Sequence, residues 1–317
     1  MPSLCENPFF ARLASSHRIL VAGAGGGFDV YAGLPIALAL IESGKEVHLA
    51  NLSFTYLGGT SARWLAPHIA AVSPDTDGED RYFPERALAR WLADRGLSRN
   101  IYAFEKVGVR PLTAAYQALC SALAIDAIVL VDGGTDILMR GDEAGLGTPQ
   151  EDMASLAATA AVDVPVRLVA CIGFGVDTYH GVCHAHFLEN VAALDKDDAY
   201  LGAFSVPRTT AEGAAYLDAV AHAQAATPGR PSIVNGSIAA AIQGEFGDVA
   251  FTDRTANSEL FINPLMGLYF TFDLPGLARR SLYLRLLAGT ETIFQVSAII
   301  EAFRQSVKIR HRRTIPH

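Results

Sequence analysis

Residues 23–29 (GAGGGFD) decide the fold of this chain, because they join two apolar segments of different length. The short segment before them, residues 19–22 (ILVA), is typical of a buried strand, and the longer segment 31–41 is typical of a helix. Glycines between the two let the backbone reach positive φ and let a ligand approach without a Cβ in the way. Amides at the helix start would face that ligand, a geometry that suits a phosphate or a carboxylate. The stretch therefore predicts a strand–turn–helix unit whose ligand lies beside Gly25, Gly26 and Gly27.

The segments that follow extend this unit to an α/β sheet. A predicted helix at 30–43 ends at Gly44, and residues 46–51 (EVHLAN) are the second predicted strand, so a right-handed crossover joins two parallel strands. Further strands are expected at residues 100–104, 127–131, 166–172, 200–204, 232–235, 248–252 and 260–262. Further helices are expected at residues 84–94, 111–123, 151–161, 180–194, 210–225, 236–243, 275–287 and 291–306. This alternation predicts a doubly wound, mostly parallel Rossmann-like sheet with helices on both faces.

The chain is expected to form a single α/β domain, residues 1–317, because it contains no internal repeat and no Ser/Gly linker. Its last part, residues 275–317, is interpreted as a helical appendage that packs either on this domain or on a second subunit. The appendage ends in a basic cluster: Lys308, Arg310, His311, Arg312 and Arg313. This cluster is either a solvated tail or a subunit contact. The second alternative predicts a homo-oligomer held together by the C-terminal helices.

Composition narrows the choice of partners. The net charge of −8 argues against nucleic acid, because phosphate binding needs a basic surface. Four cysteines without C-x-x-C spacing indicate free thiols in a reducing compartment. Residues 19–41 are long and apolar enough for a membrane span, but Asp29, Pro35 and five glycines interrupt them. The first residues lack the positive charge of a secretory signal, so we expect a cytoplasmic protein with neither a membrane nor a nucleic-acid partner.

The glycine turn departs from the known nucleotide-binding fingerprints. The dinucleotide pattern G-x-G-x-x-G has Phe28 at its last position here, and Asn51 stands where an acidic residue is expected. No Gly-Lys-Ser/Thr follows, which excludes a Walker loop, and we expect no nicotinamide or flavin cofactor. Asp29 beside a phosphate would repel it unless a divalent metal lies between them or the carboxylate binds a sugar hydroxyl. The alternative is that Asp29 caps its helix, a contribution of about 0.5–2 kcal/mol.

The second candidate stretch surrounds the predicted strand at 127–131. The segment 126–152 holds seven acidic residues: Asp126, Asp132, Asp136, Asp142, Glu143, Glu151 and Asp152. Asp132 lies at the carboxyl tip of a buried strand, where open α/β sheets place their sites, and Asp136 can point back to the same spot. Paired carboxylates there either hold a hard cation, Mg²⁺, Mn²⁺ or Ca²⁺, or share a proton as acid and base. We therefore predict Asp29, Asp132 and Asp136 as metal ligands, and Asp132 and Asp136 also as catalytic residues.

The other residues of this segment receive separate interpretations. The turn between the two aspartates, Gly133, Gly134 and Thr135, is predicted to bind the ligand. A simpler alternative for Asp132 is that it caps its loop. The remaining acidic residues of the stretch are interpreted as solvated surface charge: Asp142, Glu143, Glu151 and Asp152.

A third group of candidates lies at residues 177–190 (DTYHGVCHAHFLEN). His180 and His184 would share a helical face, a spacing that can ligate a transition metal, although the H-E-x-x-H pattern is missing. One of the two acting as general acid or base is the favoured role, and the alternative is a pair of helix-end residues satisfied by backbone or water. Asn51 and Asn235, each at the end of a predicted strand, are candidates for binding ligand hydroxyls. For Asn235 the alternative is that it starts the next helix.

Three stretches together resemble a known family: residues 25–35 (GGGFDVYAGLP), residues 47–54 (VHLANLSF) and residues 132–136 (DGGTD). The chain resembles the uncharacterised family called domain of unknown function 1152, which implies no activity. Residues 131–136 (VDGGTD) are also similar to the aspartate cluster of the nucleoside hydrolases, which binds calcium and ribose at a strand end. The stretch departs from that cluster, because it lies on a later strand and lacks both the leading strand aspartate and the doubled Asp-Asp.

These observations favour an enzyme that acts on a nucleoside, nucleotide or sugar phosphate, with a divalent cation, by hydrolysis or transfer at a glycosidic or phosphoryl bond. Its ligand would be a small molecule that is anionic or contains a sugar. No G-x-S-x-G motif provides a serine nucleophile, and no hydride-transfer signature is present. The alternative is a protein that binds a nucleotide or metabolite without catalysis. A third interpretation is an assembly component that uses the final helices and the basic tail as an interface.

Overall fold

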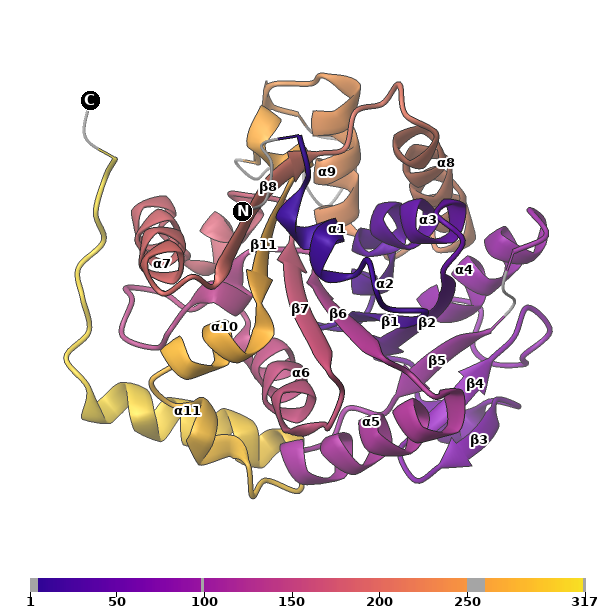
Figure 1. The fold of residues 1–317 in the computed structure, drawn as a ribbon, viewed down its shortest axis with the longest axis horizontal. Coiled ribbons are helices and arrows are strands. Elements are labelled where there is room, and N and C mark those ends of the chain that lie inside the picture. Colours follow the sequence, from indigo (N-terminus) through magenta and orange to yellow (C-terminus); the bar gives the residue numbers. More distant parts are fainter. Residues whose placement is uncertain (1–4, 98–99, 250–259, 316–317) are drawn as a thin grey trace.

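The computed structural model describes residues 5–97, 100–249 and 260–315 around a nine-stranded sheet in the order β3-β4-β5-β2-β1-β6-β7-β11-β8 (Figure 1). Five neighbouring strands are parallel: β1 (Arg18–Gly23), β2 (Glu46–Leu52), β5 (Ile101–Phe104), β6 (Ala127–Asp132) and β7 (Val166–Cys171). The predicted doubly wound, mostly parallel α/β fold is therefore confirmed.

Helices cover both faces of the sheet, because side chains of the central strands alternate between two apolar layers. In β1, Leu20 and Ala22 contact one layer and Ile19 and Val21 contact the other, and all four are buried. The first layer contains α5 (Val109–Leu123), α6 (Pro149–Ala161), α7 (His184–Lys196), α10 (Leu274–Arg280) and α11 (Ile293–Ser306). The second contains α1 (Pro8–Arg12), α2 (Asp29–Ala32), α3 (Leu34–Glu42), α4 (Pro84–Ala93), α8 (Ala211–Ala226) and α9 (Ile233–Gln243).

Antiparallel strands that the sequence did not predict extend both sides of the sheet. On one side, β3 (Arg63–Ala66) and β4 (Ile69–Val72) form a hairpin beside β5. On the other side, β11 (Leu268–Asp273) pairs with β7 and with β8 (Tyr200–Ser205). The partners of β11 are not its neighbours in sequence, so the local pattern of apolar residues could not place this strand.

Four predicted elements differ from the observed ones. The helix expected at 275–287 is α10, which ends at Arg280, followed by a 3₁₀ turn (Leu284–Leu287). Residues 232–235 are not a strand, because Ser232 caps α9 and its hydroxyl accepts a hydrogen bond from the amide of Asn235 at 3.1 Å. The helix expected at 180–194 begins only at His184, since a 3₁₀ turn (Val176–His180) ends at Gly181 with φ of 92°. The strand expected at 248–252 is the two-residue β9 (Gly247–Asp248), which pairs with β10 (Phe261–Ile262), and positions 250–252 lie outside the described residues.

The order in which the chain adds strands to the sheet reverses between β1 and β6, which are parallel neighbours. From β1 the chain proceeds through β2 to β5 on one side, and it then returns to place β6 and β7 on the other side. Loops from the carboxyl ends of β1 and β6 therefore diverge and leave a crevice, which is where open α/β sheets bind their ligands. The glycine turn follows β1 and the 132–136 turn follows β6, so both candidate stretches border this crevice.

The C-terminal helices pack on the first layer of the same chain. Val296 and Ile300 of α11 are buried in one apolar cluster with Met153 of α6. Beyond α11 the chain runs back past α7 (Figure 1), where Arg310 Nη1 lies 2.6 Å from Glu189 Oε1. Among the described helices, none is long and apolar enough to cross a membrane.

Candidate functional site

The crevice contains a cavity of ≈ 360 Å³ that is lined by five aspartates. Their side chains are buried, with exposed fractions between 2% and 9%: Asp29, Asp132, Asp136, Asp152 and Asp177. We call this space the acidic cavity. Its other walls are formed by Gly25, Gly133 and Thr148, by the loop that carries Tyr179 and His180, and by apolar side chains that include Ile233, Val234 and Leu260.

Each aspartate comes from the carboxyl end of a strand or from the start of a helix beside it. Asp29 is the first residue of α2 after β1, Asp132 is the last residue of β6, and Asp136 begins a 3₁₀ turn (Asp136–Leu138). Asp152 lies in the first turn of α6, and Asp177 lies in the 3₁₀ turn after β7. Because β1, β6 and β7 are parallel neighbours, their carboxyl ends bring these side chains to one edge of the sheet.

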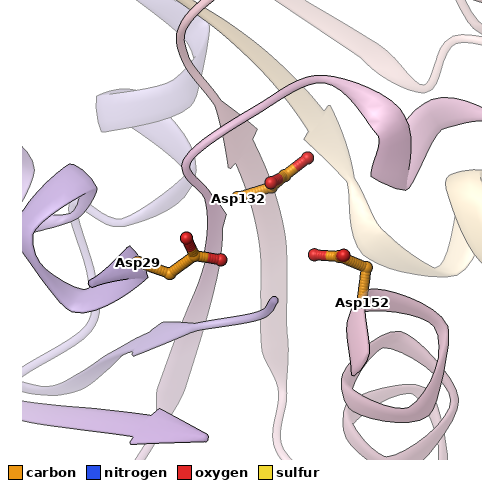
Figure 2. A group of neighbouring side chains, drawn as sticks. All are labelled: Asp29, Asp132 and Asp152. Carbon is orange, nitrogen blue, oxygen red and sulfur yellow. The ribbon is translucent and has the colours of Figure 1, made fainter. Parts of the chain in front are cut away.

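Three of the aspartates converge closely. One carboxylate oxygen from each of Asp29, Asp132 and Asp152 lies within 4.8 Å of the other two. Figure 2 shows Asp29 and Asp152 approaching from opposite sides, with the carboxylate of Asp152 directed across the gap toward Asp29 and with Asp132 between the two. Gly25 N donates to Asp29 Oδ2 at 2.6 Å and Ile137 N donates to Asp132 Oδ2 at 3.2 Å. Asp152 Oδ1 is buried and has no hydrogen-bond partner among the described residues.

The other two aspartates bind the backbone of neighbouring loops. Asp136 Oδ2 accepts a hydrogen bond from Thr148 N at 2.7 Å, which ties the 3₁₀ turn to the start of α6. Asp177 Oδ2 accepts one from Thr135 N at 2.6 Å, which fixes the turn after β6. The sequence predicted Asp136 as the third metal ligand beside Asp29 and Asp132. In the structure, Asp152 lies closest to these two residues, and Asp136 lines the same cavity.

Burial raises the pKa of all five carboxyl groups, because the charged form loses its hydration. The pKa of Asp29 rises to about 7, with burial as the largest cause, and the charge of Asp136 also raises it while the Gly25 amide opposes the shift. For Asp132 and Asp152 the pKa also rises through burial first and through neighbouring carboxylates second. The five groups cannot all be ionised without a compensating positive charge.

The geometry fits a hard divalent cation. Carboxylate oxygens are the ligands that Mg²⁺, Mn²⁺ and Ca²⁺ prefer, and the buried oxygen of Asp152 lacks any other partner among the described residues. Glycines make the convergence possible, since a Cβ at Gly25 would lie 2.8 Å from Asp29 Oδ2 and 2.9 Å from Asp152 Oδ1. A Cβ at Gly133 would likewise lie 2.9 Å from Asp29 Oδ1. Glycine at these positions leaves room for carboxylates rather than for a phosphate.

Several predicted ligand-binding residues serve the scaffold instead of lining the cavity. Gly26 and Gly27 have φ of 87° and 62°, and the space above them is filled by Phe54 and Tyr82. Asn51 is fully buried, and its Nδ2 donates to Gly27 O at 2.7 Å and to Glu85 Oε1 at 2.8 Å.

Asn235 and the turn after β6 have similar supporting contacts. Asn235 Nδ2 donates to Phe28 O at 3.1 Å, and Tyr216 Oη donates to Asn235 Oδ1 at 2.8 Å. Thr135 binds Asp177 through its amide, and a Cβ at Gly134 would lie 2.9 Å from Asp177 Oδ2. Of the predicted ligand-binding glycines, Gly25 and Gly133 line the cavity.

The two predicted catalytic histidines occupy different environments. His180 lies on the cavity wall, and its proximity to Asp136 opposes the rise that burial causes in the pKa of the Asp136 carboxyl. His184 stacks on Phe174 at a centroid distance of 4.8 Å, and its Nε2 lies 3.0 Å from Thr178 Oγ1. Burial lowers the pKa of His184. The structure therefore places His180, and not His184, at the cavity, and the two do not share a helical face.

The interpretation of Glu143 and Asp152 as solvated surface charge is wrong. Asp152 is 2% exposed, and Glu143 is fully buried. The sequence did contain a signal for Asp152. The helix that connects two parallel strands begins near the carboxyl edge of the sheet, so an acidic residue in its first turn lies near that edge. Asp177 was not singled out as a site residue, although it follows the buried strand β7 after a short glycine-containing turn, as Asp136 follows β6.

A family profile described as "Protein of unknown function (DUF1152)" matches residues 60–309, which is most of the chain. The chain belongs to this family. In this DUF1152 protein, Asp132, Asp136, Asp152 and Asp177 lie within the matched region, and Asp29 with the glycine turn lies before it. No curated protein matches the chain. The likeness to nucleoside hydrolases remains a prediction.

Proposed function

We propose that this protein is a divalent-cation-dependent enzyme that hydrolyses or transfers at a glycosidic or phosphoryl bond of a nucleoside, nucleotide or sugar phosphate. One observation carries the proposal: Asp152 places a carboxylate oxygen within 4.8 Å of oxygens of Asp29 and Asp132, and its Oδ1 is buried without a hydrogen-bond partner among the described residues. A cluster of acidic side chains alone is common in proteins. A buried and unpartnered member of the cluster is rare, because it costs free energy unless a ligand compensates it.

Asp29, Asp132 and Asp152 would hold the cation, each through one oxygen. The bound cation would supply electrostatic stabilisation to oxygens of the reacting bond. Asp136 and Asp177 keep the walls of the cavity in place through their bonds to Thr148 N and Thr135 N. The cavity volume of ≈ 360 Å³ suits a small molecule of sugar-phosphate size.

His180 is the favoured proton carrier of the reaction. Its side chain lies on the exposed side of the cavity, beside Asp136, where it can reach both ligand and solvent. One ring nitrogen of a neutral imidazole accepts a proton and the other donates one, so this side chain can accept and return a proton during turnover.

Binding of Mn²⁺ to the purified protein, followed by electron paramagnetic resonance, tests the cation site. We expect wild-type protein to bind Mn²⁺, and Mg²⁺ to displace it. Asp152→Asn removes one ligand charge and should weaken Mn²⁺ binding by at least about tenfold. The control is Asp163→Asn, an exposed aspartate that does not line the cavity, and it should leave binding unchanged. Equal binding by both variants would remove the cation from the proposal.

Turnover is tested separately, with a panel of nucleosides, nucleoside monophosphates and sugar phosphates. Release of phosphate or of a reducing sugar should require Mg²⁺ or Mn²⁺ and should be lost in His180→Ala while Mn²⁺ binding persists. A protein that binds Mn²⁺ and one of these compounds without product release would support the alternative, a non-catalytic nucleotide- or metabolite-binding protein.

A further inference from the structure

A second cavity of ≈ 380 Å³ lies at the carboxyl ends of β2 and β5, on the other side of the glycine turn. Its lining includes Phe54, Tyr56, His68, Glu105 and Lys106. We call this space the aromatic cavity. Two of its rings are exposed, Tyr56 by 79% and Phe54 by 47%, although aromatic side chains of this size are usually buried.

Each exposed ring is held against a pair of glycines. Tyr56 lies over the 3₁₀ turn Leu57–Gly59, where a Cβ at Gly58 would be 2.9 Å from its Oη and one at Gly59 would be 3.0 Å from its Cδ1. Phe54 lies over Gly26 and Gly27, where an added Cβ would be 2.7 Å and 3.3 Å from ring atoms. Glycine therefore lets one side of each ring contact the backbone closely and leaves other ring surface available to a ligand.

The glycine turn links the two cavities through Phe54. Gly25 lines the acidic cavity, and the next two glycines support Phe54, which lines the aromatic cavity. Lys106 lies at the same boundary, because its Nζ is 2.8 Å from Glu151 Oε1, next to Asp152 in the sequence. Its Nζ also lies 5.0 Å from the centroid of the Phe54 ring. Among the described residues that line either cavity, Lys106 is the one lysine or arginine.

The rim of the aromatic cavity is formed by a histidine in an uncommon backbone conformation. His68 occupies the turn between β3 and β4 with φ of 64°, in the left-handed region that favours glycine. Its Nδ1 lies 2.8 Å from Glu105 Oε2. This contact orients a ring with polar edges beside two aromatic faces, an arrangement that can bind both the face and the edge of a planar heterocycle.

We propose that the aromatic cavity binds the planar, nucleobase-type ring of the substrate. The sugar attached to that ring would pass Lys106, and the phosphoryl end would enter the acidic cavity. This inference rests on the proposed function and narrows its substrate class, since a sugar phosphate without a nucleobase would use only one of the two cavities.

Isothermal titration in the presence of Mg²⁺ tests the inference with two kinds of probe: the four common nucleoside 5′-monophosphates, and ribose 5-phosphate, which lacks the base. At least one of the nucleotides should bind about tenfold more tightly than ribose 5-phosphate, which is the effect expected from stacking one base. Tyr56→Ala should remove most of this difference and leave ribose 5-phosphate binding unchanged. Tyr56→Phe keeps the ring and should retain the difference.

A matched control is Phe294→Ala, which removes a ring that is 81% exposed on α11, outside both cavities. It should change neither affinity. Equal affinities for nucleotides and ribose 5-phosphate, or no binding of either, would overturn the inference while Mn²⁺ binding still supports the acidic cavity. Equal losses for both probes in Tyr56→Ala would overturn it too. Absence of Mn²⁺ binding in the wild type would instead refute the proposed function, and the inference would fail with it.

Discussion

Two clusters of acidic side chains in this protein differ in the positive charges that lie beside them. The cluster of Asp142, Glu143 and Glu189 is bound by arginines: Arg310 contacts all three, and Arg140 pairs with Asp142. The arginines lower the pKa of the Asp142 carboxyl, with the hydrogen bond from Arg140 as the largest cause. In the acidic cavity no lysine or arginine lines the wall among the described residues, and burial raises the pKa of every carboxyl.

The difference separates a structural cluster from a candidate site. A carboxylate that is paired and hydrogen-bonded stabilises the folded chain, whereas a buried carboxylate without a partner destabilises it until a ligand supplies charge. The basic tail, which the sequence left open as a subunit contact, uses Arg310 inside its own chain. Acidic residues therefore have opposite effects on folding stability in the two clusters. Substitutions in the two clusters should change the free energy of unfolding in opposite directions.

The largest expected effect is on the paired cluster. Glu143 is fully buried and accepts hydrogen bonds from Arg140 N, Gly141 N and Asn190 Nδ2, between 2.8 and 3.0 Å. Glu143→Ala leaves these donors and Arg310 without their partner and should lower the free energy of unfolding by about 3–5 kcal/mol. Urea unfolding measures this change. Glu79→Ala, on an exposed loop, is the control and should alter stability by less than about 0.5 kcal/mol.

A smaller effect of opposite sign is expected in the acidic cavity. A carboxyl whose folded pKa is raised binds its proton more tightly in the folded state, so its stabilising contribution is complete below the unfolded pKa and is lost as pH rises. For Asp29 this loss extends from about pH 4 to the folded pKa of about 7. Cation-free protein should therefore lose stability through this range, and saturating Mg²⁺ should reduce the loss.

Asp152→Asn isolates the contribution of the acidic cavity from that of Asp142 in the paired cluster, whose lowered pKa gives the opposite pH dependence. The variant cannot ionise at position 152, so at about pH 8 it should be more stable than cation-free wild type. At about pH 5 the difference should shrink. Urea unfolding at both pH values, without cation, provides the measurement. A variant that is less stable than wild type at the higher pH would show that Asp152 is paired and that the two clusters are alike.

The central part of the fold could be predicted from sequence, because it depends on local pattern. The apolar runs of β1, β6 and β7 are short and bounded by glycine or charge, and the helices between them have helical periodicity, so βαβ units follow. The strand β11 depends on pairing with β7 and β8, which lie far from it in the sequence, and the local hairpin of β3 and β4 joins the sheet through the pairing of β4 with the distant β5. No local pattern encodes that pairing.

The candidate site was predicted where a residue lies at a strand end or in the glycine turn that follows one. Asp132 was found in the first way and Asp29 in the second. Asp152 was interpreted as solvated surface charge, although it is buried. The burial of an acidic side chain on a helix depends on which strand ends pack beside that helix. Conversely, the three consecutive glycines suggested a ligand loop, while two of them support Phe54 through contacts that only the fold creates.

The smallest expected effect tests whether glycine at the turn makes room for carboxylates. Gly25 lacks the positive φ of its two successors, so Gly25→Ala adds a methyl group without backbone strain. That methyl would lie 2.8 Å from Asp29 Oδ2 and 2.9 Å from Asp152 Oδ1 and should push the two carboxylates apart. Mn²⁺ affinity should fall about tenfold, equivalent to about 1.4 kcal/mol. Gly289→Ala, where an added Cβ meets no atom within 4 Å among the described residues, is the control. If both variants bind Mn²⁺ as the wild type does, the convergence of Asp29 and Asp152 does not determine the cation site, and the contrast between the clusters would rest on charge alone.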